Sequence, residues 1–137
     1  MAAWKEYDYT AQWDGKDTVY RPILDIEVIN PENGRTFKTK ALVDSGTDNI
    51  ALDFEIAEAI GIDLSTAPQG KLTGVGETVA YRSEVKISIK ETGLEEEVPA
   101  LFAKGLSFPV LLGQKFFFHL YDVRFEKRRN KFFLKKL

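Results

Sequence analysis

The 137-residue sequence contains no cysteine and a single histidine, His119. Disulfide bridges, thiolate zinc sites and a cysteine nucleophile are therefore excluded, and one chain cannot assemble a histidine-rich metal centre. No apolar stretch approaches the length that spans a membrane, and residues 1–8 hold no hydrophobic run of the kind found in a signal peptide. We therefore expect a cytoplasmic protein that does not associate with membranes.

An excess of charge of one sign is also missing. The 19 basic and 21 acidic residues leave a formal net charge of −2, which gives no electrostatic basis for binding nucleic acid. The length fits one domain, and the composition is that of a soluble globular protein. We expect residues 19–137 to form this domain. Residues 1–18 form an N-terminal arm without a clear period, compatible with an extra strand, an arm to a partner or a frayed tail.

Alternating apolar residues predict most of the secondary structure. Leu24, Ile26 and Val28 alternate with charged residues as in a half-buried strand, and the Asn33-Gly34 turn leads into a second strand over 37–43. Further strands are expected over 79–90, 98–102, 123–125 and 132–134. At least six strands and at most two short helices indicate a mostly β protein, either a closed barrel or a folded sheet.

Local signals also place the helices and the faces of the longest strand. Asp53 is a suitable cap for a short helix that ends at Ile60, and Gly61 suits its exit. A second short helix is expected over 116–120, and residues 95–97 form a run of three acids typical of a solvated edge. One face of the longest strand is predicted to carry Val79, Tyr81, Ser83, Val85, Ile87 and Ile89.

The most informative stretch is the one that follows the strand ending at Val43. Asp44 stands there. Moving a carboxylate out of water costs roughly several kcal/mol unless hydrogen bonds or function compensate. Ser45 is able to donate a hydroxyl, and Gly46 lets backbone amides approach the carboxylate. The sequence predicts a short loop that presents one acid, although the Asp-Ser-Gly triplet by itself also fits an ordinary turn.

Three blocks along the chain carry a family resemblance. They are residues 41–48 around Asp44, the triplet Gly74-Val75-Gly76 between two extended stretches, and residues 110–113 before a short helix. In this order they resemble the retropepsin-like aspartic proteases, the single-lobed relatives of pepsin. The resemblance implies a closed β barrel or folded sheet with one or two short helices, and a peptide or protein substrate.

The resemblance also implies roles for the residues of the acidic loop. Family members contribute one catalytic aspartate per chain and act as homodimers, so Asp44 pairs with Asp44 of a second copy. Ser45 hydrogen-bonds across the dimer axis, and Gly46 lets the substrate backbone lie close to the acids. Thr47 and Asp48 line the cleft and hold the main chain of the substrate.

The other two blocks are given roles in the same way. The resemblance makes Gly74, Val75 and Gly76 the tip of a flap over the peptide, although the triplet alone equally fits a plain hairpin turn. Leu111, Leu112 and Gly113 pack beneath the acidic loop, with Leu111 or Leu112 lining a specificity pocket. The chain departs from many members at Gln114-Lys115, where those members carry an arginine or an acid.

The chemistry of paired carboxylates agrees with this composition. Two carboxylates about 3 Å apart share one proton, as in the aspartic proteases that serve as the standard case. The ionised member takes a proton from water, and the protonated member polarises the scissile carbonyl. This reaction needs no cysteine, metal or cofactor. Because one chain holds one such motif, the mechanism predicts a symmetric dimer.

Other interpretations of the same residues stay open. A fold of this family does not guarantee activity, so a catalytically inactive dimerisation or peptide-binding module is the alternative, motivated by Gln114-Lys115. His119 fits the end of a helix, and a Ser-His-Asp triad lacks its Gly-x-Ser-x-Gly elbow. Asp44 and Asp48 make a weak cation site. Residues 116–118 fit core packing, and residues 127–129 fit a solvated hairpin tip.

Overall fold

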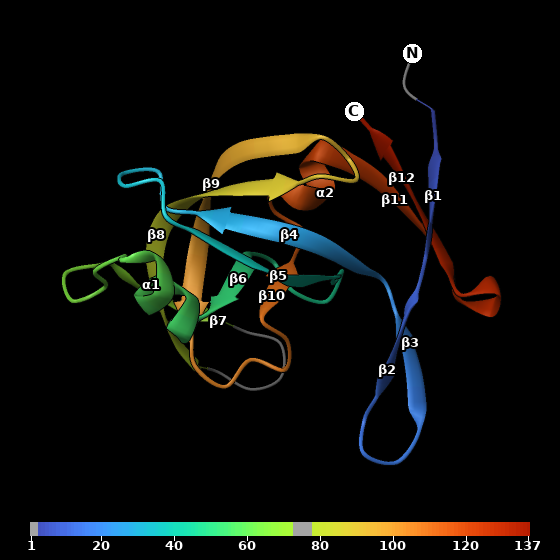
Figure 1. The fold of residues 1–137 in the computed structure, drawn as a ribbon, viewed down its shortest axis with the longest axis horizontal. Coiled ribbons are helices and arrows are strands. Elements are labelled where there is room, and N and C mark those ends of the chain that lie inside the picture. Colours follow the sequence, from blue (N-terminus) through green and yellow to red (C-terminus); the bar gives the residue numbers. More distant parts are fainter. Residues whose placement is uncertain (1–2, 73–77) are drawn as a thin grey trace.

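The computed structural model describes residues 3–72 and 78–137, which form a closed barrel with a smaller sheet and a hairpin beside it (Figure 1). The barrel strands are β4 (Ile23–Ile29), β5 (Thr36–Val43), β6 (Ile50–Asp53), β8 (Thr78–Ile89), β9 (Leu94–Ala103) and β10 (Val110–Leu112). They run in the order β4-β5-β10-β6-β9-β8, and a pairing of β4 with β8 closes the ring. The mostly β fold with a closed barrel, predicted from the sequence, is confirmed.

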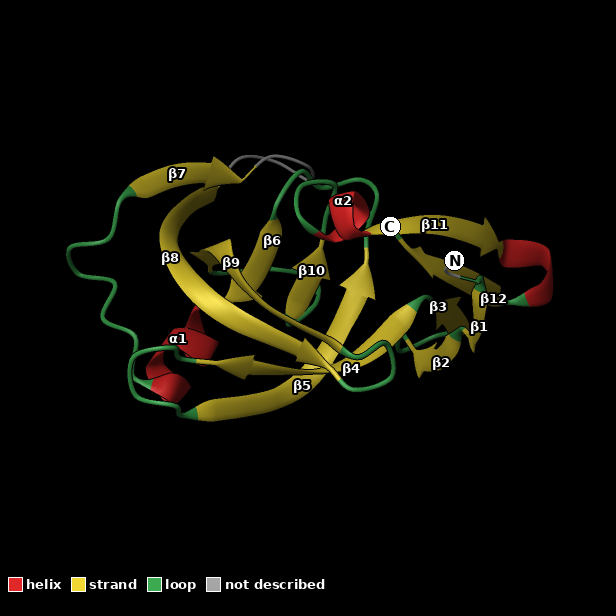
Figure 2. Ribbon diagram, turned by 90° about the horizontal axis from the view of Figure 1, so that it is seen from above, coloured by secondary structure: helices red, strands yellow, loops and turns green. Residues whose placement is uncertain are grey.

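Alternation along the strands fills the barrel core. Leu24, Ile26 and Val28 are all buried, as their spacing predicts, and Ala41 and Val43 bury the inner face of β5. Figure 2 shows β8 and β9 as long arched strands that cover one side of the barrel. A short edge strand, β7 (Gln69–Leu72), pairs antiparallel with the start of β8.

The predicted face of β8 is buried in its second half and exposed at Val79. Val85, Ile87 and Ile89 are buried in the main core, but the Val79 side chain is 54% exposed. Ala80 is buried instead, in a second apolar cluster on the outside of the barrel. Here β8 extends past the barrel to pair with β7, so the residues that face inward farther along the strand face solvent at Val79.

Helix α1 (Phe54–Ile60) begins and ends at the predicted residues. The Asp53 carboxylate accepts a hydrogen bond from the Glu55 amide at 3.0 Å, and Gly61 adopts a left-handed φ of 75°. From the turn after β4, the buried Asn30 amide donates to the Ile60 carbonyl at 3.0 Å. This contact joins the helix end to the barrel.

The second predicted helix, α2 (Phe117–Leu120), is a single turn that follows Phe116. Phe117 is buried in the main core, and Phe116 and Phe118 pack against it, as expected for core packing. Neither helix in the described part of the chain is long and apolar enough to cross a membrane.

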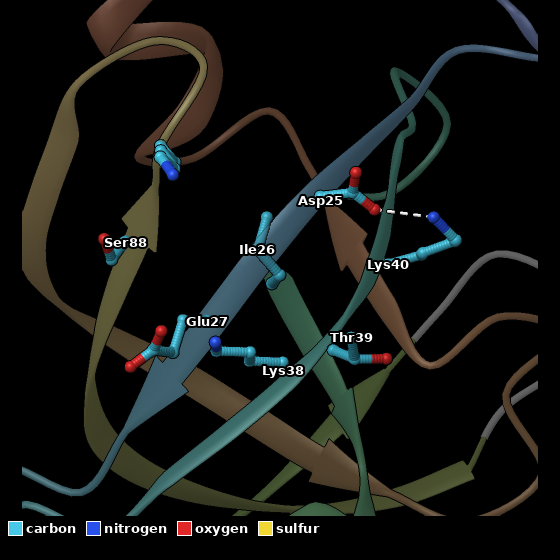
Figure 3. Close-up of a pocket in the computed structure, with 8 residues that line it drawn as sticks. Asp25, Ile26, Glu27, Lys38, Thr39, Lys40 and Ser88 are labelled. Atoms are coloured by element: carbon cyan, nitrogen blue, oxygen red, sulfur yellow. Dashed lines mark hydrogen bonds and ion pairs between the residues drawn. The ribbon is translucent and has the colours of Figure 1, made fainter.

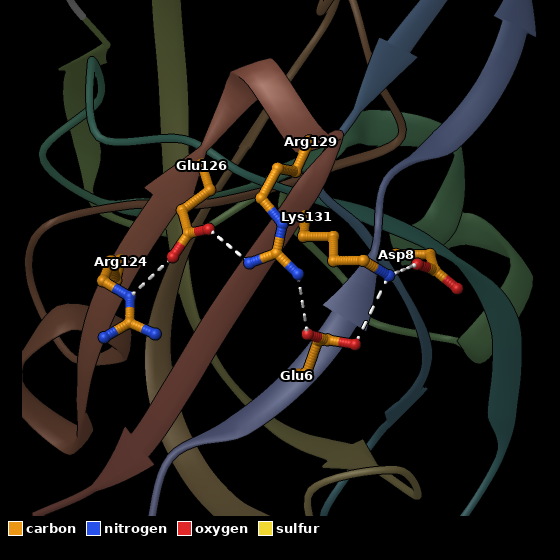
Figure 4. Close-up of polar contacts among 6 residues, drawn as sticks. All are labelled: Glu6, Asp8, Arg124, Glu126, Arg129 and Lys131. Atoms are coloured by element: carbon orange, nitrogen blue, oxygen red, sulfur yellow. Dashed lines mark hydrogen bonds and ion pairs between the residues drawn. The ribbon is translucent and has the colours of Figure 1, made fainter.

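A three-stranded sheet joins the two ends of the chain. It consists of β1 (Lys5–Asp8), β12 (Lys131–Lys136) and β11 (Tyr121–Glu126), with β12 in the middle. The Tyr7 and Phe132 rings stack on the inner face at a centroid distance of 5.3 Å. On the outer face, alternating acids and bases form the ion pairs drawn in Figure 4, in which Lys131 contacts both Glu6 and Asp8.

The remaining strands form a hairpin that projects from the barrel (Figure 1). Its strands are β2 (Thr10–Trp13) and β3 (Thr18–Arg21), which pair antiparallel. Strands β1 and β2 both lie within residues 1–18, for which the sequence leaves a strand, an arm and a tail open. The 3₁₀ turn η1 (Lys127–Arg129) connects β11 to β12, and all three of its residues are exposed, as expected for a hairpin tip.

Candidate active site

Two parallel strands place Asp44 at the end of the barrel. Strand β5 ends at Val43, which lies in register with Leu112 of β10. The Asp44 amide donates to the Leu112 carbonyl at 3.0 Å, which extends the ladder by one residue. The half-buried Asp44 therefore follows directly from a fixed strand.

The loop after Asp44 folds back onto its carboxylate. The Gly46 amide donates to Asp44 Oδ1 at 2.9 Å, and the Thr47 amide lies 3.5 Å from the Asp44 carbonyl. A Cβ atom at position 46 would lie 3.2 Å from Asp44 Oδ1, so a side chain there would crowd the carboxylate. This is the close approach that the sequence predicts for a glycine at this position.

Residues 113–115 hold the loop from the other side. The Gln114 amide donates to the Thr47 carbonyl at 2.9 Å, and the Lys115 amide donates to the Asp48 carbonyl at 2.7 Å. The Gln114 side chain adds a third bond, from Nε2 to the Ser45 carbonyl at 2.8 Å. We call these bonds the loop clamp. Sequence reasoning noted Gln114 only as a departure and did not find this role.

Gly113 allows the clamp to approach so closely. A Cβ atom there would lie 2.3 Å from the Asn49 carbonyl oxygen and 2.5 Å from that of Thr47. Both atoms belong to the backbone, so the loop itself would have to move. The expected packing of Gly113 beneath the acidic loop therefore has a specific steric cause.

The side chains of the loop differ in their accessibility. Ser45 and Asp48 are exposed, whereas Thr47 is only 5% exposed. Within the described residues, Thr47 Oγ1 is buried without a hydrogen-bond partner. A buried hydroxyl of this kind is usually satisfied, so the loop carries one unused donor and acceptor.

The two leucines of the third block lie on opposite sides of the barrel wall. Leu112 is fully buried in the main core, whereas Leu111 belongs to the second cluster. Leu111 lies in register with Leu42, two residues before Asp44. We call this second cluster the outer apolar cluster; its members include Leu42, Ala51, Leu72, Ala80, Leu101, Ala103, Leu106, Phe108 and Leu111.

The predicted flap residues Gly74, Val75 and Gly76 lie outside the described residues. The strands on either side pair antiparallel from Gln69–Tyr81 to Leu72–Thr78. Because Leu72 packs in the outer apolar cluster, the end of β7 lies against the same cluster as Leu111.

A groove of about 450 Å³ lies elsewhere on the barrel, where β4 and β8 separate beyond the Glu27–Ser88 pair (Figure 3). Its rim carries charges of both signs, including an exposed ion pair between Asp25 and Lys40 at 2.6 Å. None of the predicted site residues lines this groove. Among the residues that the structure describes, no cluster of carboxylates and imidazoles is suited to a metal ion.

Comparisons with known proteins agree with this geometry. A family model described as "gag-polyprotein putative aspartyl protease" matches residues 32–119, more than half of the chain. A retropepsin-like aspartic protease from Rickettsia conorii superposes with a TM-score of 0.66 at 23% identity, covering 99% of this chain and 94% of that one. No curated protein sequence matches the chain significantly.

Two more solved structures share the fold at lower similarity. The EIAV protease superposes with a TM-score of 0.55 at 19% identity, covering 80% of this chain and 93% of that one. The retroviral protease-like domain of Ddi1 from Leishmania major gives 0.53 at 16% identity, covering 84% and 94%. The fold is that of the retropepsin-like aspartic proteases. By its match to the family model, the chain belongs to the gag-polyprotein aspartyl protease family.

Proposed function

We propose that the protein is an aspartic endopeptidase that acts as a homodimer, with Asp44 from each copy forming the catalytic pair. The family and the fold support a protease. The chain supplies one Asp-Ser-Gly motif, so a second copy is needed for a pair of carboxylates. A closed symmetric dimer brings the same loop of both copies to one axis.

The reaction would proceed without a covalent intermediate. The two Asp44 carboxyls share one proton because two like charges about 3 Å apart do not both ionise. The ionised carboxylate removes a proton from water as the oxygen attacks the scissile carbonyl carbon, and the protonated carboxyl donates a hydrogen bond to the carbonyl oxygen. The apparent pKa values of such a pair belong to both residues together.

The surroundings of Asp44 suggest the remaining roles. Ser45, which is exposed, hydrogen-bonds across the dimer axis, and Gly46 leaves room for the substrate main chain. Asp48, which is exposed, holds that main chain through its polar groups, whereas Thr47, to which the resemblance gives the same role, is buried beside it. Of the two leucines, Leu111 lines the specificity pocket, because Leu112 is buried in the main core. The residues of the outer apolar cluster favour an extended hydrophobic segment of substrate.

The resemblance gives Gly74, Val75 and Gly76, which lie outside the described residues, the role of a flap, and this role stays a prediction.

The observation that carries the proposal is the fixed position of Asp44. Its carboxylate accepts the Gly46 amide at 2.9 Å, while the loop clamp holds the carbonyls of Ser45, Thr47 and Asp48. An acid positioned by backbone on both sides keeps its orientation when a second carboxyl approaches, as electrostatic catalysis requires.

The test compares the wild type with Asp44→Asn on a mixed peptide library across acidic and neutral pH. Asp25→Asn is the matched control, because Asp25 is an exposed acid in the groove of Figure 3. We expect cleavage by the wild type and by the control, and none by Asp44→Asn. Cleavage that survives in Asp44→Asn, or a wild-type dimer that cleaves nothing, would reject the proposal.

A further inference from the structure

The β2–β3 hairpin has no sheet to pack on. It forms a two-stranded sheet of its own within the described residues, and it projects from the barrel (Figure 1). A two-stranded hairpin is at best marginally stable in water, so a hairpin of this kind needs support from outside its own ladder.

One face of the hairpin carries exposed aromatic residues. Register pairs Trp13 with Thr18 and Ala11 with Tyr20, which places these four side chains on one face. All four are exposed, Trp13 at 70% and Tyr20 at 42%. We call them the hairpin face. Tryptophan and tyrosine are the residues that most often anchor protein interfaces.

The hairpin is nevertheless held in a defined position. Lys127 Nζ donates to the Tyr20 carbonyl at 3.2 Å and lies 5.3 Å from the centre of the Tyr9 ring. At the tip, Asp14 Oδ1 accepts the amides of Lys16 at 2.8 Å and Asp17 at 2.7 Å. The hairpin face is therefore preorganised, which lowers the entropic cost of binding a partner.

The base of the hairpin lies beside the acidic loop. Pro22, directly after β3, accepts a hydrogen bond from the Val43 amide at 2.9 Å, and Val43 precedes Asp44. Strand rise places Trp13, opposite Thr18, about 13 Å from this base along the hairpin. A second copy of the chain, placed with its Asp44 beside this Asp44, therefore lies within reach of the hairpin face.

The C-terminal strand is already paired on both sides within the chain. Strand β12 lies between β1, with which it pairs from Lys5–Leu134 to Asp8–Lys131, and β11, so only β1 and β11 are edges of this sheet. The hairpin face is an exposed aromatic surface that begins near the acidic loop: Trp13 is 70% exposed, and Tyr20 is 42% exposed although Lys127 Nζ lies 5.9 Å from the centre of its ring. We propose that the hairpin is an arm that clasps a second copy of the chain, with the hairpin face packed on that copy's surface. This inference rests on the proposed function, because that function requires the second copy at Asp44.

The first test measures the dimer dissociation constant by sedimentation equilibrium for Trp13→Ser and Tyr20→Ser. We expect each substitution to raise it by at least about tenfold, with unchanged thermal unfolding of the barrel. Phe37→Ser is the matched control, since Phe37 is 36% exposed at the opposite end of β5 from Asp44. It should dimerise like the wild type.

A second test observes Trp13 directly. The chain has two tryptophans, so Trp4→Phe leaves Trp13 as the only one. We expect acrylamide quenching of Trp13 to decrease as the protein concentration passes through the dimer dissociation constant. Quenching that changes only when peptide substrate is added would overturn the proposal and assign the hairpin face to substrate.

The outcomes separate this inference from the proposed function. If Trp13→Ser and Tyr20→Ser dimerise and cleave like the wild type, the arm is rejected and the protease stands. If the wild type dimerises without cleaving and Trp13→Ser weakens the dimer, the protease is rejected and the arm stands. A wild type that stays monomeric up to about 1 mM, where weak specific association is still detected, overturns both.

Discussion

The side-chain amide of Gln114 donates to the backbone carbonyl of Ser45 at 2.8 Å, across a separation of 69 residues. The bond ties the segment after β10 to the residue next to Asp44. At this position the chain differs from many members of the family, which carry an arginine or an acid. Here the glutamine contributes to the loop clamp, so the departure does not weaken the case for a functional loop.

Gln114→Met keeps the volume of the side chain and removes its amide. We expect kcat/KM for peptide cleavage to fall about tenfold, or about 1.4 kcal/mol, because the acidic loop loses one bond that fixes it. The free energy of unfolding should change by less than about 0.5 kcal/mol, since Gln114 is exposed. Lys115→Met is the control, because Lys115 joins the clamp through its backbone amide. Equal kinetics for the two variants would contradict this role.

Gly113→Ala places a methyl group against two backbone carbonyls, at 2.3 Å and 2.5 Å. No flexible side chain is available to yield, so we expect unfolding to become easier by more than about 3 kcal/mol in urea denaturation. Gly70→Ala is the matched control, because its new Cβ meets only Leu101 Cδ2 at 3.5 Å. If both variants unfold at the same urea concentration, the clamp is looser than described.

Asn30 is buried, and it bonds in two directions. Its amide donates to the Ile60 carbonyl at 3.0 Å, and its Oδ1 accepts the Glu32 amide at 2.9 Å. We expect Asn30→Ala to lower the free energy of unfolding by about 1–3 kcal/mol, because the substitution leaves buried polar groups unpaired. Asn33→Ala serves for comparison, because Asn33 is exposed and bonds the same carbonyl at 3.1 Å. A larger loss for Asn33→Ala would refute this assignment.

The attachment of β1 should depend on alkaline pH. Burial raises the pKa of Tyr7 above its ordinary 10.0, and hydrogen bonds to Asp8 and Glu6 raise the pKa of Lys131 above 10.5. Both groups hold their proton more tightly when folded, so their stabilising contribution is full below about pH 10 and is lost as the pH rises through the folded-state values. We expect β1 to detach from β12 in this range.

Fluorescence of Trp4 reports on that detachment, since Trp4 precedes β1 and lies 5.0 Å from the Arg124 guanidinium. Emission should shift to that of a solvated indole above pH 10, and in the Trp13→Phe background the signal belongs to Trp4 alone. High salt at neutral pH should act in the same direction but weakly, because the ion pairs of Figure 4 are largely exposed. Emission that stays constant to pH 11 would disprove the linkage.

Features that depend on neighbouring residues could be predicted from the sequence. Asp53 and Gly61 bound α1 because capping is a local property of a few residues. The alternation that ends at Val43 placed Asp44 at the end of a strand, because one buried face imposes a period of two. These local signals were enough to indicate the barrel and the acidic loop.

Features that depend on distant partners could not be predicted in the same way. The residues around Lys5 and Leu134 carry no local signal that these two residues lie in register. The hydrogen bond of Gln114 in the loop clamp forms only once the acidic loop has folded. Val79 shows a third reason. Its period matches the inward face, but the strand has left the core there, and the tertiary environment decides its exposure.

The ring of the barrel closes at one short seam. Strands β4 and β8 pair only from Glu27–Ser88 to Ile29–Lys86, whereas β8 and β9 pair from Ala80–Ala103 to Ile89–Leu94. Separating the seam would open the ring while leaving every other ladder intact. The amides of β4 and β8 that donate across this seam should therefore exchange with deuterated solvent before those that donate between β8 and β9.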